Sequence, residues 1–204
     1  MPPKYSIADL IFAFRMKRTI KEKIILNRLK KQDIEAFTET YDLYVDKLYR
    51  FVYFKVGEVE MAQDLTSEVF LRTWNYVCEN KEVNVKTLPA LLYRVARNVV
   101  IDHYRANKHN VSIDQVNEDG ELKLDIEATG DDPIDKLDID LTMDKVQTAL
   151  AQLKDEYREI IVMRYIDELT IEEIADILEK NKGNIRVLAY RALQALKAIL
   201  GVDN

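Results

Sequence analysis

Apolar residues recur at steps of three and four through most of the chain, which is the period of an amphipathic α-helix. The longest such stripe begins after Asp33 and comprises Phe37, Tyr41, Tyr44, Val45, Leu48, Phe51 and Val52. Asp33 is a residue type that caps helix N-termini, and Gly57 is a type that ends helices. The pattern therefore predicts a long helix from Asp33 to about Val56.

Two more helices are predicted in the front half of the chain. Between positions 59 and 77 one face carries Leu65, Val69, Thr73, Trp74 and Val77. Pro89 fits the first turn of a third helix that extends to about Asn107, because the first turn needs no hydrogen bond from the proline nitrogen. Three helices of this length can close a small core, which places one domain at 31–110.

Residues 1–30 are basic and apolar, and we expect one or two short helices there from the spacing of Ile7, Leu10, Ile11 and Phe14. A packed or frayed N-terminal extension is favoured over a helix that binds a membrane surface or a partner. The first apolar run contains Asp9 and is far shorter than the roughly 20 residues of a membrane span, so no span is expected.

The periodic pattern stops at 111–143, where two Gly, one Pro and a dense run of acids occur. This composition is typical of a flexible acidic linker. Helical spacing then returns in four segments joined by short connections, at 146–153, 156–165, 171–178 and 183–200. The predicted fold is therefore all-α, with a second small helical domain at 144–204.

The last two of these segments have the features of a helix-turn-helix. Thr170 can cap the first helix, and Glu173 three residues later completes a capping-box pattern. Ala175 is small, as two steeply crossing helices require where they approach closely. A short polar joint leads into the second helix, which in this motif enters the DNA major groove with its N-terminal residues foremost.

The outward face of the second helix carries candidate DNA contacts: Lys182, Asn184, Arg186, Val187, Tyr190, Arg191 and Gln194. Arg186 lies one turn into the helix, where a guanidinium can form two hydrogen bonds with a guanine edge. Lys182 and Arg191 are placed for phosphates, which supply affinity without sequence information. The alternatives are that these cations are only solvated surface charges and that Tyr190 is a packing residue.

The net charge of −6 is unevenly distributed. Residues 1–111 carry 19 Lys and Arg against 14 Asp and Glu, residues 112–144 carry 2 against 12, and residues 145–204 carry 9 against 10. The acidic balance therefore comes from the linker and does not argue against DNA binding. A single cysteine, Cys78, excludes an internal disulfide framework, and no Cys/His cluster suits a metal or cofactor, as expected of a cytoplasmic protein.

Three segments resemble the sigma-70 family of bacterial RNA polymerase sigma factors. Residues 62–74 are similar to the family's polymerase-binding helix, 92–105 to its promoter-melting and minus-ten-reading helix, and 153–196 to its minus-thirty-five-binding domain. In the order of these segments, and in lacking the extra domains of housekeeping members, the chain resembles the extracytoplasmic-function subclass, group IV. The resemblance implies a transcription initiation factor whose partners are promoter DNA and core RNA polymerase, at the beta-prime clamp and the beta flap.

For polymerase binding the resemblance points to Asp64, Glu68, Phe70, Leu71 and Arg72. The charged members project from one side at four-residue spacing, and such ion pairs set orientation and association rate more than affinity. An apolar neighbour therefore supplies much of the binding energy. Phe70 suits either this surface or the core, and Trp74 is expected in the core. Ser67 stands where the family commonly has Gln, which weakens that contact.

The third helix and its flank concentrate cations that are candidates for binding the single-stranded minus-ten element: Lys86, Arg94, Arg97, Arg105 and Lys108. The resemblance implies that Arg97 and Asn98 contact its non-template bases. A cationic groove with aromatic faces suits single-stranded DNA, and the loop 78–87 would hold a flipped base. Tyr104 is a candidate stacking residue, whereas core packing is favoured for Tyr93. In an alternative interpretation Arg94 and Asp102 form a structural ion pair.

The recognition helix departs from the family pattern at Val187 and Leu188, where a polar residue and often Arg occur. A valine can meet a thymine methyl but reads no donor or acceptor, so a different or looser minus-thirty-five element is expected. The linker matches the place where the family threads a segment through the polymerase channels. It could also fold back on the basic third helix, which deletion of 114–140 would test. Group IV factors are commonly held inactive by an anti-sigma factor, which the resemblance therefore implies as a further partner.

Two other classes of protein are alternatives to a sigma factor. An enzyme is disfavoured because the chain has no Gly-rich phosphate loop, and His103 and His109 have no nucleophile partner in the sequence. A regulator that acts without polymerase would use the helix-turn-helix alone and dimerise to reach two half-sites. Gel filtration with and without core polymerase distinguishes this regulator from a sigma factor.

Overall fold

The computed structural model describes residues 7–80, 85–108 and 143–201, with side chains over 16–80, 85–106 and 145–201. These residues form helices and turns without strands: α1 Ile7–Leu29, α2 Ile34–Val56, α3 Val59–Glu79, α4 Leu88–Lys108, α5 Met143–Gln152, α6 Asp155–Ile161, the π-helical turn η1 Val162–Ile166, α7 Ile171–Leu178 and α8 Lys182–Leu200. The all-α prediction is confirmed. Of the linker predicted at 111–143, residues 111–142 lie outside the described residues, as does part of the 78–87 loop.

α1 is one continuous helix where the sequence predicted one or two short ones. No Gly or Pro occurs between positions 7 and 29, so no residue in this stretch interrupts the backbone hydrogen bonds. The last turns of α1 pack against α2, and their side chains Ile25, Leu26 and Leu29 are buried. This part of the N-terminal extension is therefore packed rather than frayed.

Both ends of α2 are set by the residues that the sequence indicated. The Asp33 carboxylate accepts hydrogen bonds from the backbone nitrogens of Glu35, at 2.9 Å, and Ala36, at 3.2 Å. Gly57 has a φ of 76° and its N–H donates to the carbonyl of Tyr53. Any other residue would be strained at this left-handed φ, which explains why glycine ends the helix.

The front core lies between α2, α3 and α4. Tyr44, Leu48 and Phe51 of α2 are buried in it. The Phe51 ring meets the ring of Tyr93 on α4 edge-on, with 5.1 Å between the centroids. Tyr93 is fully buried, which confirms that it packs in the core and does not offer a stacking face.

The rear helices form a second core around the helix-turn-helix. The predicted capping box is present at α7, because Thr170 and Glu173 each accept a hydrogen bond from the other's backbone nitrogen. The helix predicted at 156–165 changes at Val162 from α6 into the π turn η1. The buried face of the helix-turn-helix comprises Ile174, Ala175, Ile177, Ile185, Ala189, Ala192 and Leu193.

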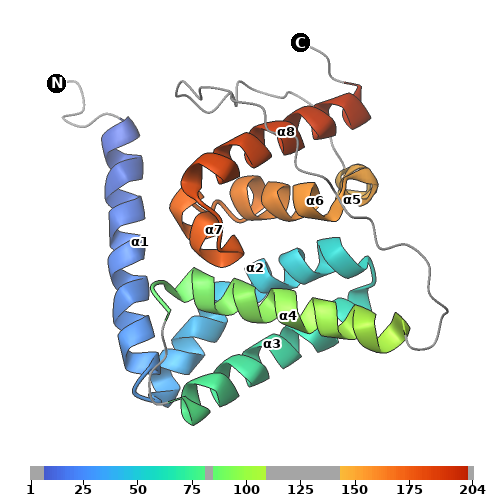
Figure 1. Ribbon diagram of the computed structural model, residues 1–204. Helices are drawn as coiled ribbons and strands as arrows, with labels where there is room; N and C mark the ends of the chain where they lie inside the picture. Colours follow the sequence, from blue (N-terminus) through green and yellow to red (C-terminus); the bar gives the residue numbers. More distant parts are fainter. Residues whose placement is uncertain (1–6, 81–84, 109–142, 202–204) are drawn as a thin grey trace.

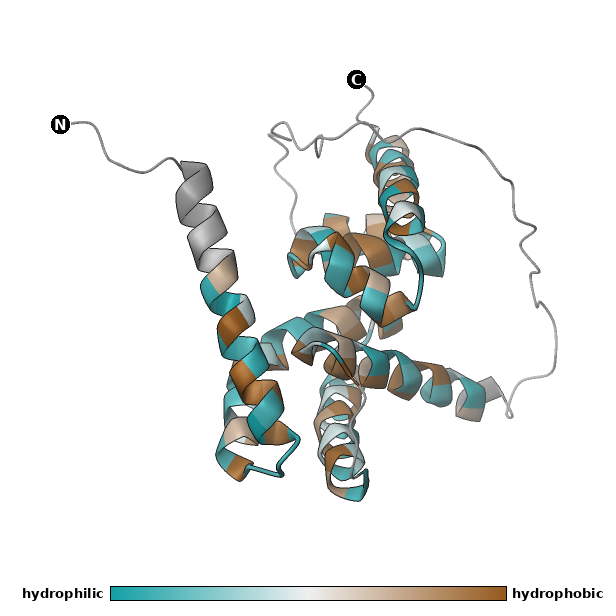
Figure 2. Cartoon of the chain, turned by 60° about the vertical axis from the view of Figure 1, so that its left-hand side comes forward, coloured by the Kyte–Doolittle hydropathy of each residue, from teal (hydrophilic) through white to brown (hydrophobic). Residues whose placement is uncertain are grey.

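The rear helices lie over α2 and α4, and α1 stands beside both groups (Figure 1). α4 packs against α7, while α2 packs against α5 and α6. Figure 2 shows the same stacking from another side, with hydrophilic and hydrophobic positions mixed along the helices. The front and rear helices are therefore in direct contact, which the sequence pattern did not indicate.

Candidate nucleic-acid interface

The predicted DNA-binding face of α8 is largely open to solvent. Lys182, Asn184 and Arg186 are exposed, whereas Val187 and Arg191 are half-buried. The side of α8 that packs on α6 and α7 is apolar, so the polar side is left facing outward. Tyr190 belongs to this outward side and is 52% exposed, which removes the alternative that it is a packing residue.

The start of α8 is held by its own cap and by the preceding helix. The Asn181 side chain accepts a hydrogen bond from the backbone nitrogen of Asn184 at 2.8 Å. Lys182 Nζ donates to Glu172 Oε1 at 2.9 Å, and this hydrogen bond lowers the pKa of Glu172. The positive charge of Arg186 acts on Glu172 in the same direction. An ion pair between two largely exposed side chains therefore joins the first turn of the recognition helix to α7.

Two predicted minus-ten residues of α4 are engaged with the rear helices. Arg97 Nε donates to Glu159 Oε1 of α6 at 2.7 Å. Arg94 Nε donates to the carbonyl oxygen of Asp176 at 3.1 Å, and its Nη1 lies 3.4 Å from Glu179 Oε1. These guanidinium groups therefore contact acids and a carbonyl of the same chain in this arrangement.

The other candidates on or beside α4 are more accessible. Lys86 lies before the helix with 82% of its side chain exposed, and its Nζ is 3.7 Å from Asp176 Oδ1. Asn98 and Arg105 are exposed. The side chain of Lys108, at the last position of α4, lies outside the described residues. Part of the predicted cationic surface is thus exposed to solvent, and the rest contacts other residues of the same chain.

The alternative of an ion pair between Arg94 and Asp102 is excluded, because each side chain has other partners. Asp102 Oδ2 lies 2.5 Å from Nη1 of Arg72 on α3, and Arg72 Nε also donates to Glu68 Oε1 at 2.8 Å. Arg94 is drawn to α7 instead, as described above. Arg94 and Asp102 are eight positions apart on α4, or about 12 Å along its axis, so their side chains reach different neighbouring helices.

Tyr104 is exposed near the end of α4, and its hydroxyl donates to the backbone carbonyl of Lys55 at 2.8 Å. Burial is the main cause that raises the pKa of Tyr104. Its ring therefore stays neutral at physiological pH and remains partly accessible, as a stacking residue requires.

The α3 residues predicted to bind polymerase divide between surface and core. Leu71 is 61% exposed, whereas Phe70 is 3% exposed. The Phe70 ring lies 4.7 Å from that of Tyr41 and 6.3 Å from that of Phe37, measured between centroids. The core alternative for Phe70 is thereby favoured. Trp74 is half-buried against Phe37 at 5.0 Å, consistent with its expected packing role.

A buried carboxylate that the sequence analysis missed connects the two helical groups. Asp167 follows η1 and is 1% exposed. The hydroxyl of Tyr93 donates to Asp167 Oδ2 at 2.8 Å, and Arg50 Nη2 donates to Oδ1 at 3.0 Å. Burial raises the pKa of Tyr93 well above its ordinary value, so the hydroxyl stays a neutral donor. One carboxylate of the rear group is therefore bound by α4 and α2 together.

Stability should depend on the protonation of Asp167. Burial raises the pKa of this carboxyl above the ordinary 3.8, and the hydrogen bond from Tyr93 and the charges of Arg50 and Lys47 only partly oppose this. Since the folded state then binds the proton more tightly than the unfolded state, the contribution of Asp167 to stability rises as pH falls through the raised pKa toward 3.8.

Asp167→Asn removes this titration. Measured by denaturant unfolding at a series of pH values, the free-energy difference between the native chain and the variant should shift in favour of the native chain as the pH falls. Parallel curves for the two proteins would contradict the assignment.

Two other kinds of feature do not occur in the described parts of the chain. None of the helices there is long and apolar enough to cross a lipid bilayer. In the same residues no three His, Cys, Asp or Glu side chains are grouped so that they could hold a metal ion.

An all-helical chain with a capped helix-turn-helix and an exposed polar recognition face has the architecture of a DNA-binding transcription protein. The family profile "Sigma-70 region 2" matches residues 40–110, and "Sigma-70, region 4" matches residues 143–196. The chain belongs to the sigma-70 family of RNA polymerase sigma factors, in its extracytoplasmic-function (ECF) subclass, and acts in transcription initiation.

Two individual members of this family are similar to the chain in sequence. The ECF RNA polymerase sigma factor SigW of Bacillus subtilis is 32% identical over 89% of this chain and 97% of its own. The ECF sigma factor BldN of Streptomyces coelicolor is 30% identical over 88% of this chain and 66% of its own.

Two solved structures share the fold. CnrH in complex with the cytosolic domain of CnrY superposes with a TM-score of 0.63 at 17% identity, covering 90% of this chain and 99% of that one. RpoE in complex with the anti-sigma factor NepR from Bartonella quintana gives a TM-score of 0.58 at 22% identity, covering 82% of this chain and 98% of that one.

Proposed function

We propose that three helix faces divide the work of initiation in this sigma factor. On α3, the exposed residues Asp64 and Leu71 and the half-buried pair Glu68 and Arg72 bind core polymerase. The cations of α4 and its flank bind the separated minus-ten strand, and the N-terminal half of α8 enters the duplex at the minus-thirty-five element. The observation that carries the proposal is the exposed polar face of α8 on a fully capped helix-turn-helix.

The protein works by binding and positioning, with no catalytic step of its own, in the cytoplasm where core polymerase and promoter DNA are found. An anti-sigma factor is a further partner in this proposal. RpoE of Bartonella quintana is solved with such a factor, NepR, and its fold is similar to that of this chain.

Run-off transcription with purified core polymerase and a library of genomic fragments tests the function. New transcripts that start at a shared upstream pattern are expected only when the protein is added. If core polymerase initiates identically with and without it, the proposal fails. Gel filtration then tests the rival regulator, for which a stable dimer that ignores core polymerase is the expected result.

Charge reversal on the α3 face should weaken polymerase binding. Asp64→Lys combined with Glu68→Lys is expected to slow association with core polymerase roughly tenfold at low salt, because surface charges steer encounter. The measurement is surface plasmon resonance over a range of salt concentrations. The matched control reverses Asp42 and Asp46, which have the same spacing and are exposed on α2. Equal slowing in both variants would show that only net charge matters.

A further inference from the structure

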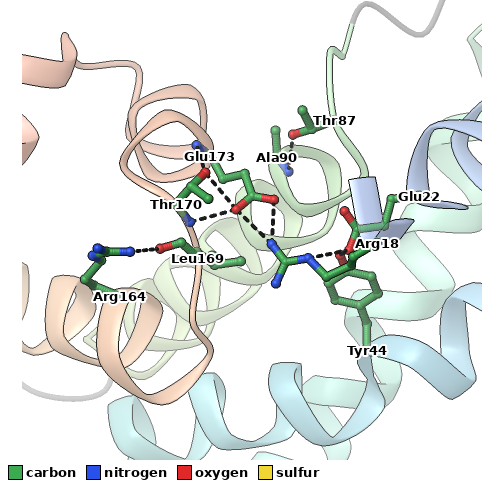
Figure 3. Close-up of polar contacts among 9 residues, drawn as sticks. All are labelled: Arg18, Glu22, Tyr44, Thr87, Ala90, Arg164, Leu169, Thr170 and Glu173. Atoms are coloured by element: carbon green, nitrogen blue, oxygen red, sulfur yellow. Dashed lines mark hydrogen bonds and ion pairs between the residues drawn. The ribbon is translucent and has the colours of Figure 1, made fainter. Parts of the chain in front are cut away.

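α1 reaches the helix-turn-helix although it lies outside the residues that either family profile matches. Arg18 Nη2 of α1 donates to both carboxylate oxygens of Glu173 on α7, at 3.1 and 3.2 Å (Figure 3). The two residues are 155 positions apart in the sequence. The side chains are 22% and 11% exposed, so this pair is much less screened by water than a surface ion pair.

The contact continues from α1 into the front core. Arg18 Nε lies 3.5 Å from Glu22 Oε1, one turn along α1. The hydroxyl of Tyr44 on α2 donates to the same Glu22 oxygen at 2.6 Å. Figure 3 shows the resulting series of polar contacts from Tyr44 through Glu22 and Arg18 to Glu173. Arg18 is therefore anchored on the front helices while it holds a rear one.

The Glu173 end of this series of contacts is also held in place. Glu173 Oε2 accepts a hydrogen bond from the backbone nitrogen of Thr170 at 2.7 Å, and the Glu173 nitrogen donates to Thr170 Oγ1 at 3.1 Å. The carboxylate that Arg18 binds is thus the capping-box carboxylate of α7. Because a capping box immobilises this side chain, holding Glu173 holds the first helix of the helix-turn-helix.

α4 contacts the same rear helix α7 and also α6. Arg94 donates to the Asp176 carbonyl of α7, and Arg97 donates to Glu159 of α6. Glu159 is 3% exposed, so moving Arg97 to a phosphate while the two groups remain packed would take a hydrogen bond from a buried carboxylate. Separating the front and rear helices would free both guanidinium groups together.

We propose that α1 is an intramolecular latch: the Arg18–Glu173 ion pair adds to the Asp167 contacts in holding the rear helices on the front helices, and so withholds Arg94 and Arg97 from nucleic acid. The statement that Arg94 and Arg97 are withheld from nucleic acid rests on the proposed minus-ten role of α4. The statement that the ion pair holds the two helical groups together does not. Without Arg18 the carboxylates of Glu22 and Glu173 lose the cation that both of them contact, and their mutual repulsion adds to the loss of the hydrogen bonds.

The closure is tested by distances in the full chain. The single cysteine, Cys78, is exposed on α3 and accepts one spin label, and Ala198→Cys provides a second exposed site on α8. Pulsed electron spin resonance then gives the distance distribution between the front and rear groups. In Arg18→Ala the fraction of long distances should rise roughly tenfold, the size expected for losing a hydrogen bond between charged groups. An unchanged distribution would overturn the latch.

Two further variants distinguish opening caused by loss of the ion pair from opening caused by general damage to the helices. Glu173→Gln keeps a capping-box residue but removes the charge, so it should open the chain less than Arg18→Ala and leave α7 intact by circular dichroism. Lys17→Ala removes an exposed cation one position away and should leave the distribution unchanged. If Lys17→Ala opens the chain as much as Arg18→Ala, the specific pair is not the latch.

A second measurement distinguishes the latch from the role of α4. Binding of a short fluorescein-labelled single-stranded DNA carrying the promoter's non-template minus-ten sequence is followed by anisotropy without polymerase. Arg18→Ala should bind it more tightly than the native chain, by about the factor by which the open fraction rises. An open chain with unchanged affinity would show that the latch exists and that Arg94 and Arg97 do not bind this strand.

Discussion

Replacing Phe51 by alanine is expected to lower the free energy of unfolding by about 3–5 kcal/mol. Its side chain is 0% exposed in the front core. The ring lies edge-on to Tyr93, and Lys55 Nζ is 5.7 Å from its centroid. Alanine would leave a cavity between α2 and α4, where surrounding helices can relax only in part. Urea unfolding followed by circular dichroism measures the loss.

Leu71→Ala is the matched control, because it also truncates a large apolar side chain but at a position 61% exposed. Its effect on unfolding should stay within about 0.5 kcal/mol. Similar losses in the two variants would mean that Phe51 does not occupy the centre of the folded core.

The second large effect is expected at Arg186. Its position on the first turns of α8, exposed and beside Glu172, allows the guanidinium to reach a base edge in the major groove. Arg186→Ala should weaken binding to the minus-thirty-five element by about 1–3 kcal/mol. This corresponds to a loss of roughly five- to 150-fold in affinity. Sequence preference should relax at one base pair.

The measurement compares binding of holoenzyme to a set of promoters that differ singly through the minus-thirty-five element. Lys197→Ala, which removes a cation from the last turn of the same helix, controls for net charge. A uniform loss on every promoter would assign Arg186 to phosphate contact alone.

Most of the helices and of their ends were predictable from the amino-acid sequence. Apolar spacing located α2, α3, α4 and α8, and the cap at Asp33, the stop at Gly57 and the capping box at Thr170 form as predicted. These features depend on residues within one or two turns of each other, so local chemistry decides them. The outward face of α8 was predictable for the same reason, since the buried stripe of one helix defines its opposite side.

Tertiary structure alone decided which charges meet. Nothing near Arg18, Arg97 or Asp167 in the sequence indicates their partners, which lie 155, 62 and 117 positions away for the contacts with Glu173, Glu159 and Arg50. The choice between core and surface for Phe70 also required the position of Phe37 and Tyr41 on α2. Periodicity tells which side of a helix is apolar, but ion pairing depends on which helices come together. That is set by the packing of the whole chain.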